Sequence, residues 1–193
     1  MTKILALEWS SRRLSVAWSR DGKFEERVLE ASRFRVAEAL SLLVDCGDIL
    51  KEISEVRIGR GPGNYTGVRQ SLSWAIGFAA PGGICLKSIS SGRAQALRLL
   101  ETDGGEIAIL GDARRGQWWG ARFPADQPVW RLQDPAAWRT EVAGLKIFSP
   151  EAERLVEGVD DVVQDYPRAT DLLTFPLELP PEEPVPCYLH PAV

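Results

Sequence analysis

The chain has 193 residues and a formal net charge of −4, and its 45% hydrophobic and 26% charged content is that of an ordinary soluble protein. The acidic balance argues against a broad nucleic-acid surface, because neutralising phosphates takes clustered cations. No apolar run approaches the roughly 20 residues of a membrane helix, and the N-terminus lacks a signal-peptide layout. We therefore expect a cytoplasmic protein without membrane association. Three scattered cysteines indicate neither a disulfide framework nor a zinc site.

The chain opens with three β-rich runs, at 3–9, 14–19 and 24–30. Asp21-Gly22 between the last two is a strong hairpin signal, so these runs predict antiparallel strands. A helix pattern follows them, which favours a mixed sheet.

The segment 34–50 predicts a long helix with more apolar surface than one core requires. Its polar residues form a single stripe, and the remaining apolar arc is about twice the roughly 100° that a surface helix needs. Either the helix is sandwiched between a sheet and another helix of this chain, or a second protein buries part of it. Val36, Leu40 and Leu43 are the candidate contacts for the second case.

A glycine-rich stretch at 60–69, R-G-P-G-N-Y-T-G-V-R, joins a short strand at 53–59 to a helix at 68–80. Its glycines permit backbone conformations or close approaches that a Cβ would forbid, and its proline fixes φ. Thr66 is the predicted N-cap of the helix. A helix N-terminus behind such a loop can hold a phosphate or carboxylate, whereas the simpler interpretation is a tight turn with a good cap.

The helix at 68–80 also carries a second face. Ser71, Trp74 and Phe78 lie on it at i, i+3 and i+7, apart from the residues that face a core. A Trp–Phe pair at i, i+4 is typical of an interface anchor, and equally of a helix buried on two sides.

The rest of the chain alternates strands and helices. A strand at 84–89 leads to a helix that Ser90 or Ser91 can cap, an order that implies parallel pairing with right-handed crossovers. T-D-G-G at 102–105 is the best candidate linker. Beyond it we expect strands at 106–113, after the turn at 112–116, at 129–132 and at 145–148, and short helical segments at 135–142, from Ser149 and at 169–174.

Three stretches resemble one known family. The loop at 60–69 is similar to the G-P-G-S-F-T-G-L-R signature of the bacterial TsaB (YeaZ) proteins of tRNA threonylcarbamoyladenosine biosynthesis, which are related to the glycoprotease-like TsaD. The run D-A-R-R-G-Q-W-W-G-A resembles the opening of that family's second lobe, D-A-R-R/K-x-E-V-Y-x-A, and P-V-P-C-Y-L-H is similar to its closing P-V-Y-L-R.

The resemblance implies an α/β fold: a two-lobed, actin-like or Hsp70-like ATPase (ribonuclease H-like) fold with mixed sheets flanked by helices. We expect an N-terminal lobe at 1–101 with the glycine loop and the interface helices, a return of the tail at 185–193 to that lobe, and a smaller lobe at 106–184.

By the same resemblance, the chain is a non-catalytic subunit required for N6-threonylcarbamoyladenosine modification of tRNA beside the anticodon. The resemblance implies a heterodimer with a TsaD-type catalytic subunit, a TsaE-type ATPase in a larger complex, indirect contact with tRNA, and a homodimer when the chain is alone. The alternatives are a homodimeric scaffold of the same fold without a tRNA role, and a small-molecule phosphotransferase.

Three groups of candidate site residues follow. The glycine-loop signature comprises Gly61, Pro62, Gly63, Tyr65, Thr66, Gly67 and Arg69. The two turns that hold phosphate in the parent fold match Glu8, Ser10, Ser11, Asp112 and Arg114. The proposed partner interface comprises Val36, Leu40, Leu43, Ser71, Trp74 and Phe78.

Other residues argue against catalysis by this chain. Trp9 places a large ring where a small residue would admit phosphate in the first turn, so we expect no requirement for ATP or ADP. The single histidine, His190, cannot form the H-x-x-x-H metal pair of TsaD, and no G-x-S-x-G elbow is present. We therefore expect no metal site and no catalytic residues.

Overall fold

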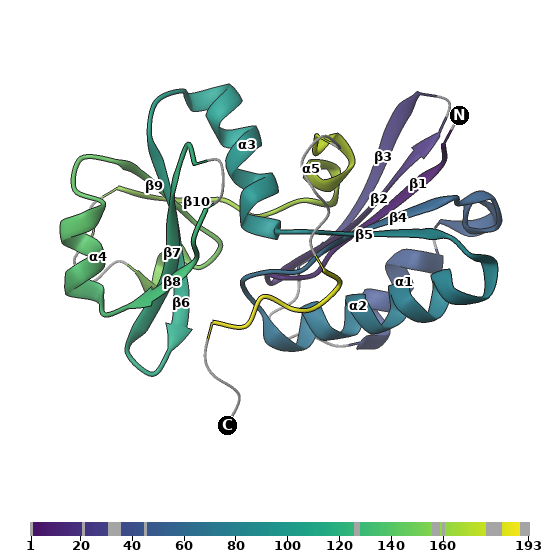
Figure 1. Cartoon of the computed structure of the whole chain (residues 1–193), viewed down its shortest axis with the longest axis horizontal. Helices are drawn as coiled ribbons and strands as arrows, with labels where there is room; N and C mark the ends of the chain where they lie inside the picture. The colour runs from purple at the N-terminus through teal and green to yellow at the C-terminus, as the bar shows by residue number, and fades with distance from the viewer. Residues whose placement is uncertain are drawn as a thin grey trace. The chain divides into compact units, whose positions relative to one another are not determined.

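The computed structural model describes residues 2–20, 22–30, 36–44, 46–125, 128–155, 159, 161–176 and 183–189. The chain divides into two compact units, Met1–Ala94 with Pro167–Cys187 and Gln95–Tyr166 with Tyr188–Val193. Each unit contains one five-stranded mixed sheet flanked by helices, which confirms the predicted α/β class (Figure 1). Within the described part of the chain, none of the helices combines the length and apolarity that a membrane span requires.

The sheet of the first unit has the strand order β3-β2-β1-β4-β5. Its strands are β1 (Ile4–Glu8), β2 (Arg13–Arg20), β3 (Lys23–Glu30), β4 (Glu55–Gly59) and β5 (Cys85–Ile89). The first three pair antiparallel, while β4 and β5 add in parallel, so the predicted antiparallel strands and the predicted parallel pairing are confirmed.

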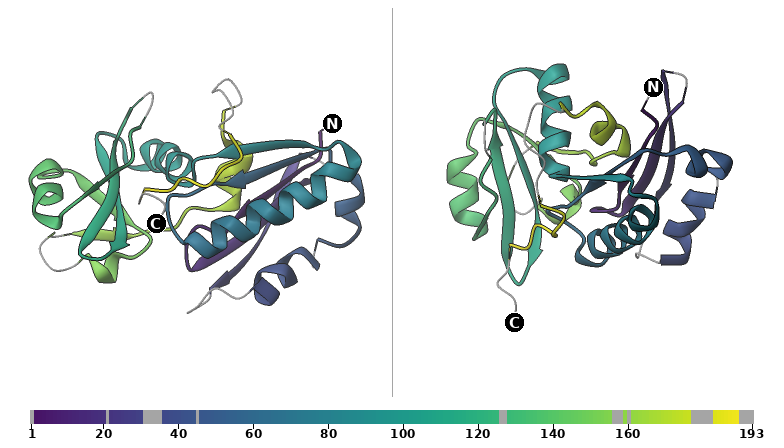
Figure 2. Two further views of the ribbon diagram at one scale, coloured as in Figure 1. Left: turned by 60° about the horizontal axis from the view of Figure 1, so that its bottom comes forward. Right: turned by 45° about the vertical axis from the view of Figure 1, so that its right-hand side comes forward.

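Helices cover both faces of this first sheet. On one face α1 (Val36–Val44) and α2 (Tyr65–Ala79) lie side by side (Figure 2). They enclose the main core together with Leu5 and Leu7 of β1. On the other face α5 (Ala169–Thr174) packs over the intervening Ala6, since successive strand residues point to opposite faces.

The first of these helices is shorter than the predicted helix at 34–50. It ends at Val44, and Gly47–Glu52 forms a separate 3-10 segment, η1, that starts with Gly47 at a φ of 53°. A left-handed glycine is a common helix terminator, so this residue divides the predicted element. The predicted start at 34–35 lies outside the described residues.

The placement of α5 differs from the expectation that 106–184 forms one lobe. Residues Pro167–Cys187 belong to the first unit. Arg57 of β4 explains how α5 is held there, because its Nη1 donates hydrogen bonds to the carbonyls of Leu172, Leu173 and Phe175 at 3.0, 2.8 and 3.3 Å.

The unit boundary and the tail also differ from the expected limits. The boundary falls between Ala94 and Gln95, inside α3 (Ser91–Asp103), rather than at the T-D-G-G stretch. The backbone N–H of Cys187 donates to the carbonyl of Arg60 at 2.8 Å, so this part of the tail does contact the glycine loop. Tyr188–Val193 are grouped with the second unit.

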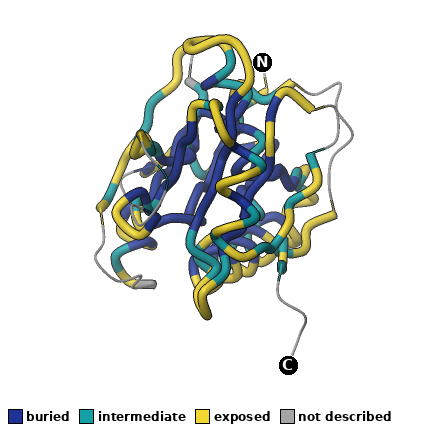
Figure 3. Tube along the Cα trace, turned by 90° about the vertical axis from the view of Figure 1, so that its left-hand side faces the viewer, coloured by how far each residue is buried: buried dark blue, intermediate teal, exposed yellow. Residues whose placement is uncertain are grey.

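The second unit has the strand order β10-β9-β6-β7-β8. Its strands are β6 (Ile107–Arg114), β7 (Gln117–Phe123), β8 (Arg131–Gln133), β9 (Lys146–Ser149) and β10 (Val162–Gln164). Ala96 and Leu99 of α3 pack on one face, and Trp138 of α4 (Pro135–Glu141) packs on the other. Buried positions run along the three central strands β9, β6 and β7 (Figure 3). Two short 3-10 segments complete the structure, η2 (Ala80–Gly82) and η3 (Ala152–Arg154).

Candidate functional site

The glycine loop positions the first turn of α2 through Asn64. The Asn64 side chain accepts hydrogen bonds from the backbone N–H groups of Thr66 at 3.1 Å and Gly67 at 3.2 Å. The helix therefore begins at Tyr65, and the prediction that Thr66 is the N-cap is wrong. Asn and Thr both cap helices well, so composition alone does not distinguish them.

The same loop packs tightly on the turn that follows β1. The N–H of Asn64 donates to the Ser10 carbonyl at 2.6 Å, and a Cβ on Gly63, whose φ is +148°, would overlap that carbonyl oxygen. Gly61 is bound from the other side, because its carbonyl accepts from the N–H of Ser91 at 3.0 Å and its own N–H donates to the Ser91 hydroxyl at 3.1 Å. The loop thus joins the first turn to the start of α3.

Glu8 lies fully buried next to Gly59, the residue that precedes this loop. Its Oε1 accepts a hydrogen bond from the N–H of Ser10 at 2.8 Å, while its Oε2 has no hydrogen-bond partner among the described residues. Only a glycine fits at Gly59, since a Cβ there would overlap Oε2 and lie 2.6 Å from the Ser91 hydroxyl. Burial raises the pKa of Glu8 above its usual range, against the opposing effects of Ser10 and of the nearby Ser91 hydroxyl, and the Asp171 carboxylate acts in the raising direction.

The other residues of the first turn are also buried. The Ser10 and Ser11 side chains are almost completely covered, and the Ser11 hydroxyl bonds the backbone of Arg13 at 3.0 and 3.1 Å. The ring of Trp9 packs in the main core under α1 and α2 rather than across the turn, because it follows the alternation of Leu5 and Leu7. The expectation that this ring crowds the phosphate position is therefore corrected.

The outer surfaces of α1 and α2 form the second candidate region. Of the six predicted contact residues, Leu43 and Ser71 are buried inside the first unit, and the side chain of Val36 lies outside the described residues. Both corrections have one cause: these positions lie on the faces that α1 and α2 turn toward the sheet. Leu40 is at the surface, with 36% of its area exposed.

Trp74 and Phe78 hold an intermediate position. Their rings stack with centroids 4.8 Å apart and an interplanar angle of 11°, and both pack against the main core while remaining partly exposed. Each ring is thus partly in the core and partly at the surface. Neither predicted alternative, an interface anchor or a helix buried on two sides, describes this arrangement alone.

Two strongly exposed apolar residues were missed. Val44 of α1 is 77% exposed and Ile76 of α2 is 47% exposed. The signal available for Val44 was its place outside the polar stripe of the predicted helix. We name the exposed set Leu40, Val44 and Ile76 the outer helix surface.

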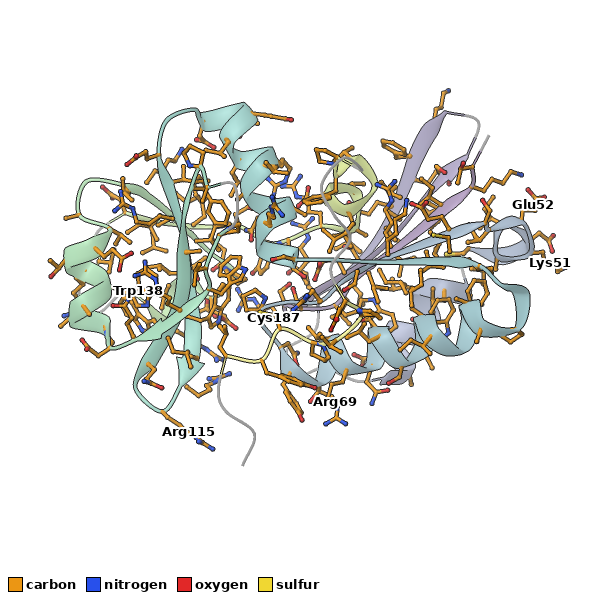
Figure 4. The ribbon with its side chains drawn as sticks, viewed as in Figure 1. Lys51, Glu52, Arg69, Arg115, Trp138 and Cys187 are labelled. Atoms are coloured by element: carbon orange, nitrogen blue, oxygen red, sulfur yellow. The ribbon has the colours of Figure 1, made fainter. Side chains whose placement is uncertain are left out.

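Tyr65 and Arg69 extend α2's exposed side at its first turn. The guanidinium of Arg69, the residue labelled in Figure 4, lies 5.2 Å from the centre of the Tyr65 ring, and its Nη1 donates to the Tyr65 hydroxyl at 2.6 Å. These two signature residues therefore stabilise each other at the surface, as i, i+4 neighbours on a helix do.

The turn between β6 and β7 holds Asp112 in the second unit. The Asp112 carboxylate accepts from the N–H of Arg114 at 2.8 Å and pairs with the guanidinium groups of Arg114 at 3.1 Å and Arg154 at 3.4 Å. The Asp112 N–H donates to Glu151 at 3.1 Å, and burial raises the pKa of Glu151. Asp112 thus organises its own hairpin. In the described ranges no three His, Cys, Asp or Glu side chains group as metal ligands, and His190 lies outside them.

Two curated relatives of the chain carry the same name. The chain is 33% identical over 119 residues to the tRNA threonylcarbamoyladenosine biosynthesis protein TsaB of Bacillus subtilis, a match that covers 59% of this chain and 52% of the relative. The protein of that name from Escherichia coli is 27% identical over 141 residues, covering 70% of this chain and 61% of the relative. The chain therefore spans between half and two thirds of these curated relatives. No family model matches it.

Solved structures agree on the fold. YeaZ from Pseudomonas aeruginosa superposes with a TM-score of 0.75 at 22% identity, and covers 98% of this chain and all of the other. A second structure from that organism, described as similar to peptidase YEAZ, gives a TM-score of 0.76 at 22% identity, again covering 98% of this chain and all of the other. The resemblance to the TsaB (YeaZ) proteins is thereby confirmed.

Proposed function

We propose that this chain, which is similar to the TsaB (YeaZ) proteins, acts in the biosynthesis of N6-threonylcarbamoyladenosine in tRNA. The observation that carries the proposal is the signature loop at 60–69. It lies in a chain that has this fold and is similar to two curated TsaB proteins. The modification concerns the adenosine beside the anticodon.

The chain acts as a partner of a catalytic subunit and carries no catalytic residues of its own. Support comes from both candidate phosphate turns: Glu8 is fully buried, and the Asp112 carboxylate pairs with two arginines. A phosphotransferase needs a carboxylate that can reach a nucleotide-bound metal ion, so this arrangement disfavours that alternative. We propose that the chain requires no metal, ATP or ADP.

The partner is a TsaD-type subunit, bound at the outer helix surface. Leu40, Val44 and Ile76 expose apolar side chains on two helices that cover the same face of the first sheet. Exposed apolar clusters of this kind mark protein contact sites. A TsaE-type ATPase joins the larger complex, the tRNA is reached through these subunits, and the chain forms a homodimer when they are absent.

Depletion of this chain in its host tests the function. We expect the threonylcarbamoylated nucleoside to fall in bulk tRNA and to return when the wild-type chain is supplied. A Val44→Glu/Ile76→Glu variant should fail to restore it, whereas Val129→Glu should restore it, because Val129 is 70% exposed but lies in the second unit. Unchanged nucleoside levels on depletion would refute the proposal.

Two further measurements separate the alternatives. Co-purification of the chain with a TsaD-type subunit distinguishes the proposed function from a homodimeric scaffold without a tRNA role. Rapid metal-dependent ATP turnover by the isolated chain, lost in Glu8→Gln or Asp112→Asn, would favour the phosphotransferase.

A further inference from the structure

The strand β3 is the longest of the four edge strands that the structure describes. Its eight residues pair with β2 without a bulge, and in the described ranges no strand pairs with its outer side (Figure 1). The other edge strands are shorter, with five residues in β5 and three each in β8 and β10. An edge strand offers a row of unpaired backbone N–H and C=O groups, so a further strand can add to it.

This edge strand also exposes apolar side chains. Phe24 is 51% exposed and Val28 is 40% exposed. Both lie on the face that α5 covers, because Glu26 between them stands opposite Ala17, which belongs to the core under α5. The short α5 contacts Glu26, whose carboxylate accepts a hydrogen bond from the N–H of Thr170 at 3.3 Å. It leaves Phe24 and Val28 at the surface.

Charge on the other face of β3 makes the strand complementary to itself. Glu25 and Arg27 lie on that face with 42% and 47% of their side chains exposed. When two copies of β3 pair antiparallel around a two-fold axis beside Glu26, Glu25 of each copy faces Arg27 of the other. Phe24 of each copy faces Val28 of the other in the same register. Opposite charges and apolar side chains that face each other across two strands stabilise the pair.

The neighbouring registers lack this match. An axis beside Glu25 places Lys23 opposite Arg27, two like charges, and an axis beside Arg27 leaves no pair of opposite charges at the centre. Each of the three registers brings one charged residue against its own copy. Only the register at Glu26 compensates for this contact with pairs of opposite charge.

We propose that β3 is a docking strand for β3 of a second copy of this chain, in the register centred on Glu26. The pairing joins the two five-stranded first sheets edge to edge. It uses a surface away from the outer helix surface, because Phe24 and Val28 lie on the α5 face while α1 and α2 cover the opposite face. The inference therefore goes beyond the proposed function and does not depend on it.

Two charge-reversed variants of the full chain test the pairing. Both are made in a parent chain with Val44→Glu and Ile76→Glu, which removes association through the outer helix surface. Glu25→Arg or Arg27→Glu alone should weaken self-association at least about tenfold in sedimentation equilibrium, because attraction becomes repulsion in two pairs. An equimolar mixture of the two variants should restore association, because every facing pair then has opposite charges. The ion pair that Glu25 and Arg27 form within one chain cannot explain this recovery, since each variant has lost it.

Disulfide cross-linking tests the register. In a chain with Cys85→Ser and Cys187→Ser, which removes the two cysteines that are not buried, Glu26→Cys should form an intermolecular disulfide on mild oxidation. Only the residue beside the axis directly faces its own copy. Glu101→Cys, at an exposed position of α3, is the control for random collision and should stay largely monomeric.

Three results would overturn the inference. A parent chain that stays monomeric at high concentration leaves the edge to a strand of another protein, without touching the tRNA role that depletion tests. Single variants that associate as well as the parent, or a mixture that stays monomeric, show that Glu25 and Arg27 do not face each other. Cross-linking that is no faster for Glu26→Cys than for Glu101→Cys places the axis elsewhere.

Discussion

Glu8 makes the stability of the first unit depend on pH. Its folded pKa is raised by burial, so the stability it contributes is fully present below its unfolded pKa of about 4.3 and is lost as pH rises through the folded value. Glu8→Gln keeps the shape and removes the charge. We expect the variant to gain stability over the wild type as pH increases from 5 to 8.

Urea unfolding of both proteins across this range measures the difference. Identical pH slopes for wild type and Glu8→Gln would contradict the prediction. A wild type that gains stability relative to the variant on going from pH 5 to 8 would mean that a cation holds the carboxylate charged.

Gly63 is the position in the loop where a side chain is least tolerated. Gly63→Val would drive a side chain into the Ser10 carbonyl and force valine to a positive φ, which we expect to cost at least about 3 kcal/mol of unfolding free energy. The matched control is Gly83→Val, which has a φ of 60° but open space around it and should cost only about 1–2 kcal/mol.

Thermal unfolding of the two variants decides the role of the loop. Equal losses would show that the contact with Ser10 contributes nothing. If Gly63→Val kept its stability and partner binding but lost nucleotide binding, the loop would be a phosphate grip rather than a structural support.

At the scale of elements, the cap of α2 gives a direct comparison. Asn64→Ala removes an acceptor used by two backbone N–H groups, so we expect a loss of about 1 kcal/mol in unfolding free energy. Thr66→Ala should change it by no more than about 0.5 kcal/mol, because Thr66 is exposed within the first turn. If urea unfolding showed a larger loss of stability for Thr66→Ala than for Asn64→Ala, Thr66 would be the cap.

The sequence predicts elements best where the pattern is local. The β-rich runs of β1 to β3 and the turn at Asp21-Gly22 specify the hairpins, and the signature loop specifies a strand followed by a helix. By contrast, β10 has only three residues and little burial, which leaves almost no periodic signal.

Packing across the sequence explains the remaining differences. The small residues Ala6 and Ala17 leave room for α5 on the first sheet, but no short-range pattern connects them to residues near 170. Leu43 and Ser71 show the same limit at the candidate site. A helical wheel shows that a helix has more apolar surface than one core needs. It does not show which of those apolar residues are buried inside the chain itself.

At the scale of the molecule, substitutions in α2 can separate the effect on partner binding from the effect on folding stability. Ile76→Glu places a charge on exposed surface, so it should leave the melting temperature nearly unchanged while weakening binding to a TsaD-type subunit by at least about 2 kcal/mol. Trp74→Glu should lower both the melting temperature and the affinity for the partner, because the Trp74 ring also packs on the core. Calorimetric titration and thermal unfolding measure the two effects.

The result with Ile76→Glu is decisive. Undiminished binding would place the contact elsewhere, and a large fall in melting temperature would make Ile76 part of the fold. Val129→Glu serves as the control for adding a surface charge, since Val129 belongs to the second unit.

The return of α5 to the first sheet has a consequence for synthesis on the ribosome. The five strands of that sheet are complete by Ile89, yet the helix that covers one of its faces emerges only after residues Gln95–Tyr166 of the second unit have been made. Until then Ala6 and Ala17 face water, and the Arg57 guanidinium lacks the three carbonyls that it will bind. A nascent chain therefore exposes an unfinished sheet during translation, the kind of intermediate that chaperones protect.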